Sequence, residues 1–325
     1  MNVVIAKKHE KEDIEMRAAY CQMLIDLAKE NEAIVTVDAD VMNSMGTTGF
    51  RKAFPERSIN CGIQEANMIG VAAGLSATGK IPFAHTFGVF ATRRVYDQIF
   101  VSCAYAKLNV KIVGGDPGIT AAFNGGTHMP FEDMGIMRNI PEVTIIEPID
   151  STMIKDLTRQ MANSYGTFYM RIQRKTAIKI YEEGSVFEIG KAVQIRDGKD
   201  ATIIATGLLV AEAIKAADIL GQKGISVRVL NMFTLKPIDK EAILKAAEET
   251  GAIVTAENHN IINGLGSAVS EVLAENTSVP MERIGVKDIF GEVGSEDYLK
   301  ERFELTANDI VKKVEKVLKR KNKKS

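Results

Sequence analysis

Segments with a strand-like pattern alternate with helix-like segments along most of this 325-residue chain. Such alternation predicts parallel β-sheets with helices on both faces, so the fold class is α/β. Strands are expected at 33–37, 81–85, 109–113, 143–146, 168–172, 201–205, 225–230, 252–256 and 281–286. Helices are expected at 14–28, 64–78, 93–107, 210–223, 240–250, 266–275 and 307–319.

The strands fall into two groups, which predicts two doubly wound domains. The length of the chain is sufficient for two cores of ordinary size. Mixed charge and glycines without a helical period mark a linker between the two groups. The expected divisions are a flexible N-terminus at 1–10, a first domain at 11–180, a linker at 181–190, a second domain at 191–318 and a basic tail at 319–325.

Composition narrows the class of protein. The formal charge of -1 argues against a general nucleic-acid binder. No apolar run reaches the ~18 residues that a membrane span needs. The N-terminus does not have the pattern of a signal peptide, and the three cysteines lack the spacing of metal ligands. We therefore expect a soluble, cytoplasmic protein with reduced thiols and no membrane or nucleic-acid partner.

Candidate functional residues follow the expected strands. In open parallel sheets, ligands bind at the carboxyl ends of the strands. Residues in that position are Asp38, Asp40, His85, Thr86, the glycine-rich segment 114–128 and Arg174. We therefore expect ligand-binding residues among these positions.

Glu65 lies at the start of the expected helix 64–78, where its carboxylate can point into a cleft. Phe87 and Phe90 follow the next strand with a spacing that suits the wall of a flat apolar ligand. Each feature has an alternative. The carboxylate can simply stabilise the positive end of the helix, and the two rings can be ordinary core residues.

The order of several motifs resembles the pyrimidine-binding half of transketolases. From about Arg17 to the end, the chain is similar to the pyrimidine-binding and C-terminal domains of that family. The motifs are Asp38-Ala-Asp40, Gly62-Ile-Gln-Glu65, Thr86-Phe-Gly-Val-Phe90, Tyr96-Asp-Gln98 and Gly126-Thr-His128. The resemblance implies a pyrimidine-binding thiamine-diphosphate fold followed by a transketolase C-terminal-like domain.

The resemblance also implies roles at a cofactor. Glu65 would be catalytic by hydrogen-bonding N1′ of the thiamine aminopyrimidine, so that the 4′ nitrogen can remove the thiazolium C2 proton. Phe87 and Phe90 would line the pyrimidine, whereas Arg93 occupies a third position that is often aromatic in the family. Asp40 matches an acid near the thiazolium, although a strand-end aspartate can also cap a turn.

For the substrate, Arg17, Ser44 and Arg174 match family positions that bind a sugar phosphate. His128 matches a catalytic histidine that reaches the substrate hydroxyls. Taken one at a time, such arginines are more often surface ion pairs, and a lone loop histidine is usually just exposed.

Two positions depart from the family pattern. Asn124 replaces an aspartate in the segment Ala122-Phe-Asn-Gly-Gly-Thr-His128, and Asp116 stands where many transketolases have a phosphate-binding histidine. An anionic side chain at position 116 would repel a phosphate. An asparagine at position 124 still hydrogen-bonds a hydroxyl but is neutral. Recognition of the usual sugar hydroxyl by Asn124 is therefore expected to persist, weaken or shift to another ketose.

The chain has no Gly-Asp-Gly followed about thirty residues later by Asn-Asn, the family signature that holds Mg²⁺ and the diphosphate. We therefore expect no metal site on this chain. A partner N-terminal subunit would hold most of the Mg²⁺ and the diphosphate, most simply in a two-plus-two heterotetramer.

These observations predict the C-terminal subunit of a split transketolase of pentose phosphate metabolism, with sugar phosphate substrates. The alternatives are a deoxyxylulose-phosphate-synthase-like enzyme, the β subunit of a 2-oxo-acid dehydrogenase and a non-catalytic scaffold subunit. Glu257 and His259 can be interpreted as a ligand pair, but a capped strand-to-helix loop explains them better. We expect the second domain to be structural.

Overall fold

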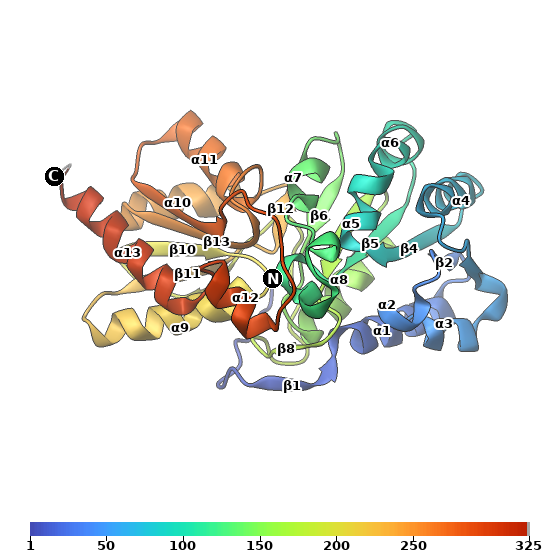
Figure 1. Cartoon of the computed structure of the whole chain (residues 1–325), viewed down its shortest axis with the longest axis horizontal. Coiled ribbons are helices and arrows are strands. Elements are labelled where there is room, and N and C mark those ends of the chain that lie inside the picture. The colour runs from blue at the N-terminus through green and yellow to red at the C-terminus, as the bar shows by residue number, and fades with distance from the viewer. Residues whose placement is uncertain (324–325) are drawn as a thin grey trace.

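Two β-sheets lie side by side in the computed structural model, which describes residues 1–323 (Figure 1). The larger sheet has seven strands, and its neighbours are parallel except for the antiparallel pair of β12 with β6. Its order is β12 (Thr234–Lys236), β6 (Thr144–Ile146), β7 (Phe168–Ile172), β5 (Lys111–Gly115), β4 (Ile81–Phe87), β2 (Ile34–Asp38) and β3 (Ser58–Asn60).

The second sheet has five strands, of which only β9 runs antiparallel to its neighbour. Its order is β14 (Met281–Val286), β13 (Ile253–Asn260), β10 (Ala201–Ala205), β11 (Val227–Asn231) and β9 (Val193–Arg196). A short antiparallel pair joins β1 (Lys11–Glu15) to β8 (Thr176–Ile178). The parallel-dominated sheets confirm the predicted α/β class.

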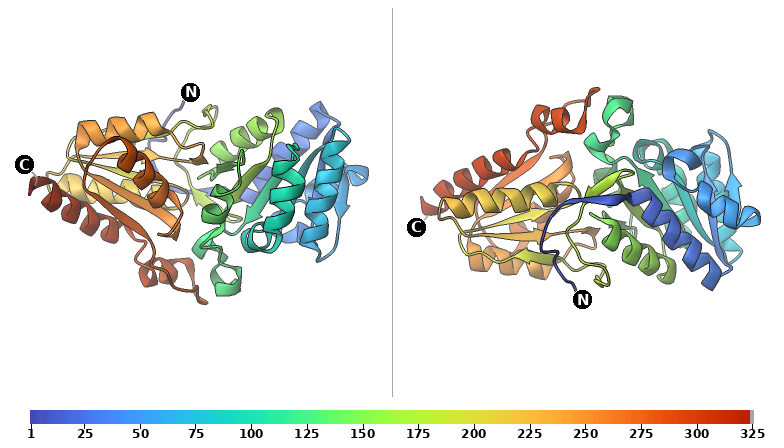
Figure 2. Two further views of the ribbon diagram at one scale, coloured as in Figure 1. Left: turned by 90° about the horizontal axis from the view of Figure 1, so that it is seen from above. Right: turned by 90° about the horizontal axis from the view of Figure 1, so that it is seen from below.

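Helices cover both faces of the sheets (Figure 2). One apolar core contains side chains of α1 (Met16–Glu30), α8 (Ser151–Asn163), α9 (Leu209–Gln222) and α13 (Ala307–Asn322). The other contains side chains of α4 (Glu65–Ala77), η3 (Ile99–Tyr105), α7 (Asp133–Arg138), α10 (Lys240–Thr250) and α11 (Leu265–Asn276). Each core includes helices of both sheets, so burial of apolar surface stabilises the two sheets together.

Short helices fill the connections between these elements. They are α2 (Met42–Met45), α3 (Thr48–Ala53), η1 (Pro55–Arg57), α5 (Gly88–Ala91), η2 (Arg93–Val95), α6 (Tyr96–Gln98), η4 (Gly118–Asn124), η5 (Gly126–His128) and α12 (Glu296–Arg302). Several of them lie next to the carboxyl ends of the strands of the seven-stranded sheet. They therefore shape the edge at which the candidate residues were predicted.

Most predicted strands and helices are present within a few residues of their expected bounds. The prediction did not include β1, β3, β8, β9 or the short connecting helices, and three differences concern longer elements or the pairing of the sheets. The helix expected at 93–107 is broken into η2, α6 and η3. Helix α8 was not predicted, although Asp150 accepts a hydrogen bond from the backbone N–H of Met153 as a normal N-cap. Strand β12 follows β11 of the second sheet but pairs with β6 of the first. The predicted boundary at 181–190 stays a prediction.

The two ends of the described chain both make contacts. Residues near the N-terminus bond to the segment 180–186, with Asn2 N to Val186 O at 3.0 Å and Ala6 N to Ile180 O at 2.8 Å. Helix α13 continues through Asn322, and Arg320 contacts Glu282 at 2.7 Å. Most of the predicted basic tail is therefore helical, and residues 324–325 lie outside the described part.

Arg171 on β7 joins the two sheets through a buried ionic network. Its side chain has no exposed surface, and its Nε and Nη1 donate to Asp133 at 2.7 Å and to Glu147 at 2.9 Å. Its Nη2 donates to the backbone oxygens of Pro130 and Asn258, at 3.2 and 3.1 Å. Asn258 belongs to β13 of the second sheet, so one guanidinium contacts segments of both sheets.

None of the helices formed by residues 1–323 is both long and apolar enough to cross a membrane. The three cysteines are free: Cys21 and Cys103 are buried, and Cys61 is half-buried.

We expect Arg171→Ala to lower the free energy of unfolding by about 3–5 kcal/mol, because the carboxylates of Asp133 and Glu147 would stay buried without their cation. The matched control is Arg159→Ala, which removes an exposed ion pair with Glu30 and should cost about 1 kcal/mol or less. Urea unfolding followed by circular dichroism measures both. Equal losses in the two variants would contradict a stabilising role for the buried network.

Candidate active site

The carboxyl ends of four neighbouring parallel strands place the candidate residues along one edge of the seven-stranded sheet. Strand β2 ends at Asp38, β4 ends at Phe87, β5 is followed by Asp116, and β7 ends two residues before Arg174. These strands are neighbours in the order β7-β5-β4-β2. The segments that follow them therefore meet at one edge, as the sequence predicted.

Three aromatic rings form a wall at this edge. Phe87 and Phe90 have ring centroids 6.2 Å apart, and His128 of η5 lies 5.7 Å from Phe87 and 5.3 Å from Phe90. All three pairs are edge-to-face, which is a favourable arrangement for rings. The wall therefore joins two candidate cofactor residues to a candidate substrate residue.

Glu65 is the first residue of α4, where its carboxylate lies at the positive end of the helix. Its side chain is only 5% exposed, and its Oε1 accepts a hydrogen bond from Arg94 Nη1 at 2.7 Å. The Arg94 guanidinium also lies over the Phe90 ring, 3.8 Å from the centroid. Through Arg94, the carboxylate is linked to the aromatic wall.

Arg174 lies on the other side of the wall. Its guanidinium is 5.1 Å from the centroid of the Phe87 ring. Its Nε and Nη2 donate to the two carboxylate oxygens of Asp116 at 2.7 and 2.6 Å, which is the bidentate geometry of strong ion pairs. Asn124 Nδ2 donates to the same carboxylate at 3.4 Å. The two positions that depart from the family pattern thus contact each other, and Asp116 also binds Arg174.

Arg17 and Ser44 complete this side of the site. Arg17 donates to the backbone oxygen of Ser44 at 3.0 Å, and Arg174 approaches the same oxygen at 3.4 Å. Arg17 also forms an ion pair with Glu15 at 2.7 Å. Both arginines predicted to bind substrate are therefore brought together, and each already has a carboxylate partner.

Asp40 lies apart from this chain of contacts. Its carboxylate accepts a hydrogen bond from Asn60 Nδ2 at 3.1 Å, and its backbone φ is 60°. Asn60 Oδ1 in turn accepts from the backbone N–H groups of Asp40 and Gly62, both at 3.0 Å. Asp40 thus stabilises the turn that leads toward Glu65, which is the alternative role expected for a strand-end aspartate. A role at a cofactor stays a prediction.

A buried polar cluster lies beneath the edge. Asp38 accepts a hydrogen bond from Thr47 at 2.8 Å, and burial raises the pKa of Asp38 to about 7. His85 bonds to the Tyr20 hydroxyl at 2.7 Å, and burial lowers the pKa of His85 to about 3. These side chains have no exposed surface, so they support the edge from below and do not contact a ligand there.

The second sheet holds the loop that carries His128. Asn258 of β13 donates to Pro117 O at 2.8 Å and accepts from Ile119 N at 3.0 Å. Gly118, with φ of 51°, lies so close to Asn258 that a Cβ at this position would overlap the amide. A residue with a side chain would therefore move the loop, and with it the wall.

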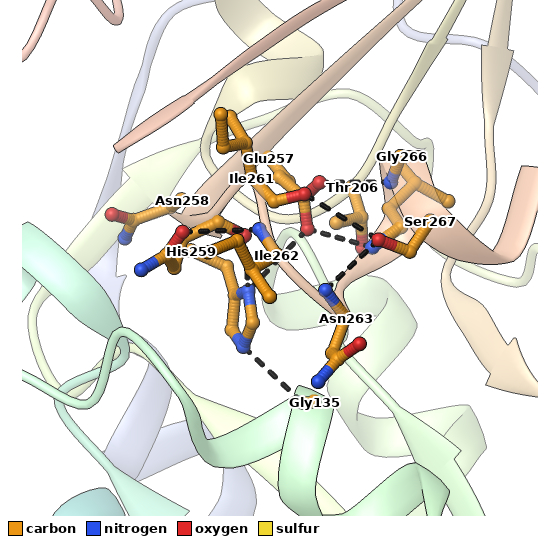
Figure 3. Close-up of polar contacts among 12 residues, drawn as sticks. Gly135, Thr206, Glu257, Asn258, His259, Ile261, Ile262, Asn263, Gly266 and Ser267 are labelled. Atoms are coloured by element: carbon orange, nitrogen blue, oxygen red, sulfur yellow. Dashed lines mark hydrogen bonds and ion pairs between the residues drawn. The ribbon is translucent and has the colours of Figure 1, made fainter. Parts of the chain in front are cut away.

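Glu257 and His259 hold a strand-to-helix loop together (Figure 3). The Glu257 carboxylate accepts from the backbone N–H groups of Leu265 and Gly266 at the start of α11, at 2.6 and 2.8 Å. His259 Nε2 lies 3.2 Å from the backbone N of Gly135, and Nδ1 lies 2.6 Å from Asn260 O. These contacts fit a neutral imidazole that carries its proton on Nδ1. The structural interpretation of this loop is confirmed.

Within residues 1–323, no group of three or more histidine, cysteine, aspartate or glutamate side chains has an arrangement that could hold a metal ion. The aromatic wall offers ring surfaces, and the Glu65 carboxylate that is linked to it through Arg94 offers a hydrogen-bonding acid. This combination suits a flat heteroaromatic ring with a basic nitrogen.

Sequence reasoning missed Arg94, which binds Glu65, and considered only its neighbour Arg93. Arg93 points instead to Glu132, with which it forms an ion pair at 2.7 Å. The sequence did contain a signal, the pair of successive arginines Arg93 and Arg94 shortly after Phe90. The side chains of two successive residues point in different directions, so either of them could have faced the site. Which of the two faces the site depends on the broken helices η2 and α6, and the sequence did not predict that break.

Comparisons with known proteins cover nearly the whole chain. The family model of the transketolase pyrimidine-binding domain matches residues 12–178, and that of the transketolase C-terminal domain matches residues 190–310. The chain is 52% identical to a 6-deoxy-6-sulfo-D-fructose transketolase subunit of Clostridium sp., with 94% of this chain and 95% of that protein covered.

Two further relatives are similar over most of their length. The chain is 38% identical to one subunit of the apulose-4-phosphate transketolase of Phocaeicola vulgatus, over 85% of this chain and 88% of that protein. A solved split-gene transketolase, described as an inactive β4 tetramer, superposes with a TM-score of 0.87 at 43% identity. That match covers 95% of this chain and 99% of the solved chain.

The buried His259 predicts a specific pH dependence of stability. Burial lowers its pKa from 6.5 to about 4, so between these values the unfolded chain binds a proton that the folded chain does not. The stability contributed by neutral His259 is complete above pH 6.5 and is lost as the pH falls toward 4. His259→Asn removes this loss. The stability advantage of the wild type over the variant should shrink by up to about 1.4 kcal/mol per pH unit of acidification.

Urea unfolding of both proteins, repeated at several pH values above and below the ordinary histidine pKa, measures this difference. The two proteins should show parallel pH dependence in the alkaline range, where the imidazole is neutral in both states and serves as the internal control. A constant difference over the whole acidic range would show that His259 does not have a lowered pKa.

Proposed function

The chain belongs to the transketolase family, and we propose that it is the C-terminal subunit of a split transketolase. In this proposal it transfers a two-carbon ketol unit from a ketose phosphate to an aldose phosphate with thiamine diphosphate and Mg²⁺. The observation that carries the proposal is the buried Glu65 carboxylate at the start of α4, linked through Arg94 to the aromatic wall. We place the protein in the cytoplasm and in pentose phosphate metabolism.

Glu65 is the proposed catalytic acid. Arg94 binds its Oε1 at 2.7 Å, which fixes the direction of the carboxylate and leaves Oε2 to hold a proton shared with a ring nitrogen. A hydrogen bond between this acid and N1′ of the aminopyrimidine would make general acid–base catalysis available at this position. In this proposal Glu65 holds the shared proton at Oε2, and Arg94 positions the Glu65 carboxylate.

Phe87 and Phe90 are the proposed contacts for the pyrimidine, since their rings pack edge-to-face and Phe90 is linked to Glu65 through Arg94. The cofactor, when bound, supplies a carbon nucleophile that no side chain can provide. The residues of the wall exclude water and orient the ring. Asp40 is proposed to lie near the thiazolium, on the turn that leads into α4.

The substrate would lie between the wall and the two arginines. His128 and Asn124 are proposed to bind the sugar hydroxyls, and Arg17, Ser44 and Arg174 to bind its far end. His128 packs against both phenylalanines, so its position depends on the wall. Its proposed catalytic part is to hold the reacting end of the sugar against the cofactor.

A partner chain of the N-terminal type is proposed to hold the diphosphate and most of the Mg²⁺, in a two-plus-two heterotetramer. A charged diphosphate requires a metal and backbone N–H donors, and the described residues of this chain offer no cluster of metal ligands. A split-gene relative that is 43% identical is described as inactive when it forms a β4 tetramer. That description supports a chain that works only with its N-terminal partner.

A sulfonated ketose is a second candidate donor. The 52% identical relative is a subunit of a transketolase that acts on 6-deoxy-6-sulfo-D-fructose. The ion pair of Arg174 with Asp116 favours an end group that carries less negative charge than a phosphate. A donor panel with fructose 6-phosphate, unphosphorylated fructose and 6-deoxy-6-sulfo-D-fructose separates these substrates.

Three alternatives are distinguished by simple observations. A deoxyxylulose-phosphate-synthase-like enzyme would consume pyruvate together with a triose phosphate. The β subunit of a 2-oxo-acid dehydrogenase would bind an acyl-carrier complex. A non-catalytic scaffold subunit would tolerate the loss of Glu65 without a change in the activity of its partner.

We expect Glu65→Gln to lower kcat of the reconstituted enzyme by about 100-fold or more, because the amide cannot hold the proton that general acid–base catalysis requires. Assembly with the partner subunit should be unchanged. The assay combines this chain, a partner that carries the Gly-Asp-Gly and Asn-Asn signature, thiamine diphosphate and Mg²⁺, and follows ketol transfer. Size-exclusion chromatography reports the assembly.

The matched control is Glu30→Gln, which removes an exposed carboxylate paired with Arg159 and should leave kcat unchanged. Full activity of Glu65→Gln would support the scaffold interpretation. Tight binding of the cofactor and metal by this chain alone would contradict the need for a partner.

A further inference from the structure

Asp116 occupies the donors with which Arg174 would bind an anionic substrate. The carboxylate oxygens of Asp116 accept from Nε and Nη2 of Arg174 at 2.7 and 2.6 Å. This is the same bidentate geometry in which an arginine binds a phosphate. The third nitrogen, Nη1, lies 3.4 Å from Ser44 O. A phosphate can therefore bind the Nε–Nη2 edge of Arg174 only by displacing a carboxylate of this chain, whereas further N–H groups remain on Nη1 and Nη2.

The fold holds Asp116 in this position. Asp116 follows β5 with a backbone φ of 59°, and its N–H donates to Ile172 O at the end of β7 at 3.0 Å. The residue is only 2% exposed, and Asn124 donates to its carboxylate. Because backbone and side chain are both fixed, the carboxylate cannot turn away to solvent when a ligand enters.

Arg17, the other arginine proposed to bind the substrate, is also paired with a carboxylate and has no uncompensated charge. Arg17 is paired with Glu15 at 2.7 Å, and it also donates to the backbone oxygens of Asn43 and Ser44. The charges of these two arginines and their two carboxylate partners balance. A doubly charged end group would meet the fixed carboxylate of Asp116 without an uncompensated cation from this pair of arginines.

We propose that Asp116 is a specificity-determining residue that selects ketoses whose far end carries one negative charge or none, over ketoses that end in a phosphate dianion. This inference rests on the proposed function of the same site. A single charge, such as that of a sulfonate, can accept from the remaining N–H groups of Arg174 with less repulsion. Like charges that are held close together suppress binding of the wrong ligand.

The test compares Asp116→Asn with the wild type in the reconstituted enzyme. The variant keeps the shape of the side chain but removes its charge and releases Arg174. The ratio of kcat/KM for fructose 6-phosphate to that for the sulfonated ketose of the donor panel should rise by about tenfold or more. The matched control is Asp197→Asn, which removes one charge from an ion pair with Arg228 outside the site. It should leave the ratio unchanged.

A second variant protects the test against misfolding of the first. Asp116→Gly also removes the carboxylate, and glycine adopts the backbone φ of 59° at this position without strain. The same ratio should again rise by about tenfold. If both variants are active and the ratio stays constant in both, Asp116 does not determine specificity.

Ligand binding separates this inference from the proposed function. Isothermal titration of the reconstituted pair with inorganic phosphate and with methanesulfonate requires no turnover. Asp116→Asn should bind phosphate at least about tenfold more tightly than the wild type, with little change for methanesulfonate. If no donor is turned over but this shift is observed, the proposed reaction fails and the role of Asp116 stands. An unchanged affinity for phosphate would overturn the role of Asp116.

Discussion

The buried guanidinium of Arg171 is the interaction on which the position of the candidate site depends. It bonds Asp133 at the start of α7, Glu147 after β6, and the backbone oxygens of Pro130 and Asn258. A cation without solvent is tolerated only where several partners surround it, and here those partners come from both sheets. Any movement of one sheet against the other would separate charges in a medium of low dielectric. The junction between the sheets is therefore rigid, although its centre is polar.

This rigidity extends to the residues that carry chemistry. Pro130 ends the loop that begins at Pro117, and Asn258 holds the start of the same loop through two hydrogen bonds. His128 lies within that loop and packs against Phe87 and Phe90. The five-stranded sheet contributes no side chain to the aromatic wall. Its contact with the site is the pair of hydrogen bonds by which Asn258 holds the loop.

The sequence predicted the repeating strands and helices well, because a parallel sheet covered on both faces produces long apolar runs separated by amphipathic helices. It also placed the segment 114–128 and Arg174 at one edge, because the rule of strand ends depends only on topology. It could not predict which carboxylate pairs with which arginine. Arg94 with Glu65, and Arg174 with Asp116, are separated by 29 and 58 residues, and no local pattern connects residues so far apart. Strand β12 was missed for the same reason: only three residues long, it is defined by its partner β6.

The position of β12 in the sequence has a consequence for folding of the chain during its synthesis on the ribosome. The edge strand β6 of the seven-stranded sheet is complete at Ile146, but its neighbour arrives only with Thr234–Lys236, after β9, β10 and β11 of the other sheet have been synthesised. Until then the nascent chain presents an open edge, on which another polypeptide could add a strand. The first half of the molecule therefore cannot finish folding before much of the second half has emerged. Chaperone protection during translation would matter most over that interval.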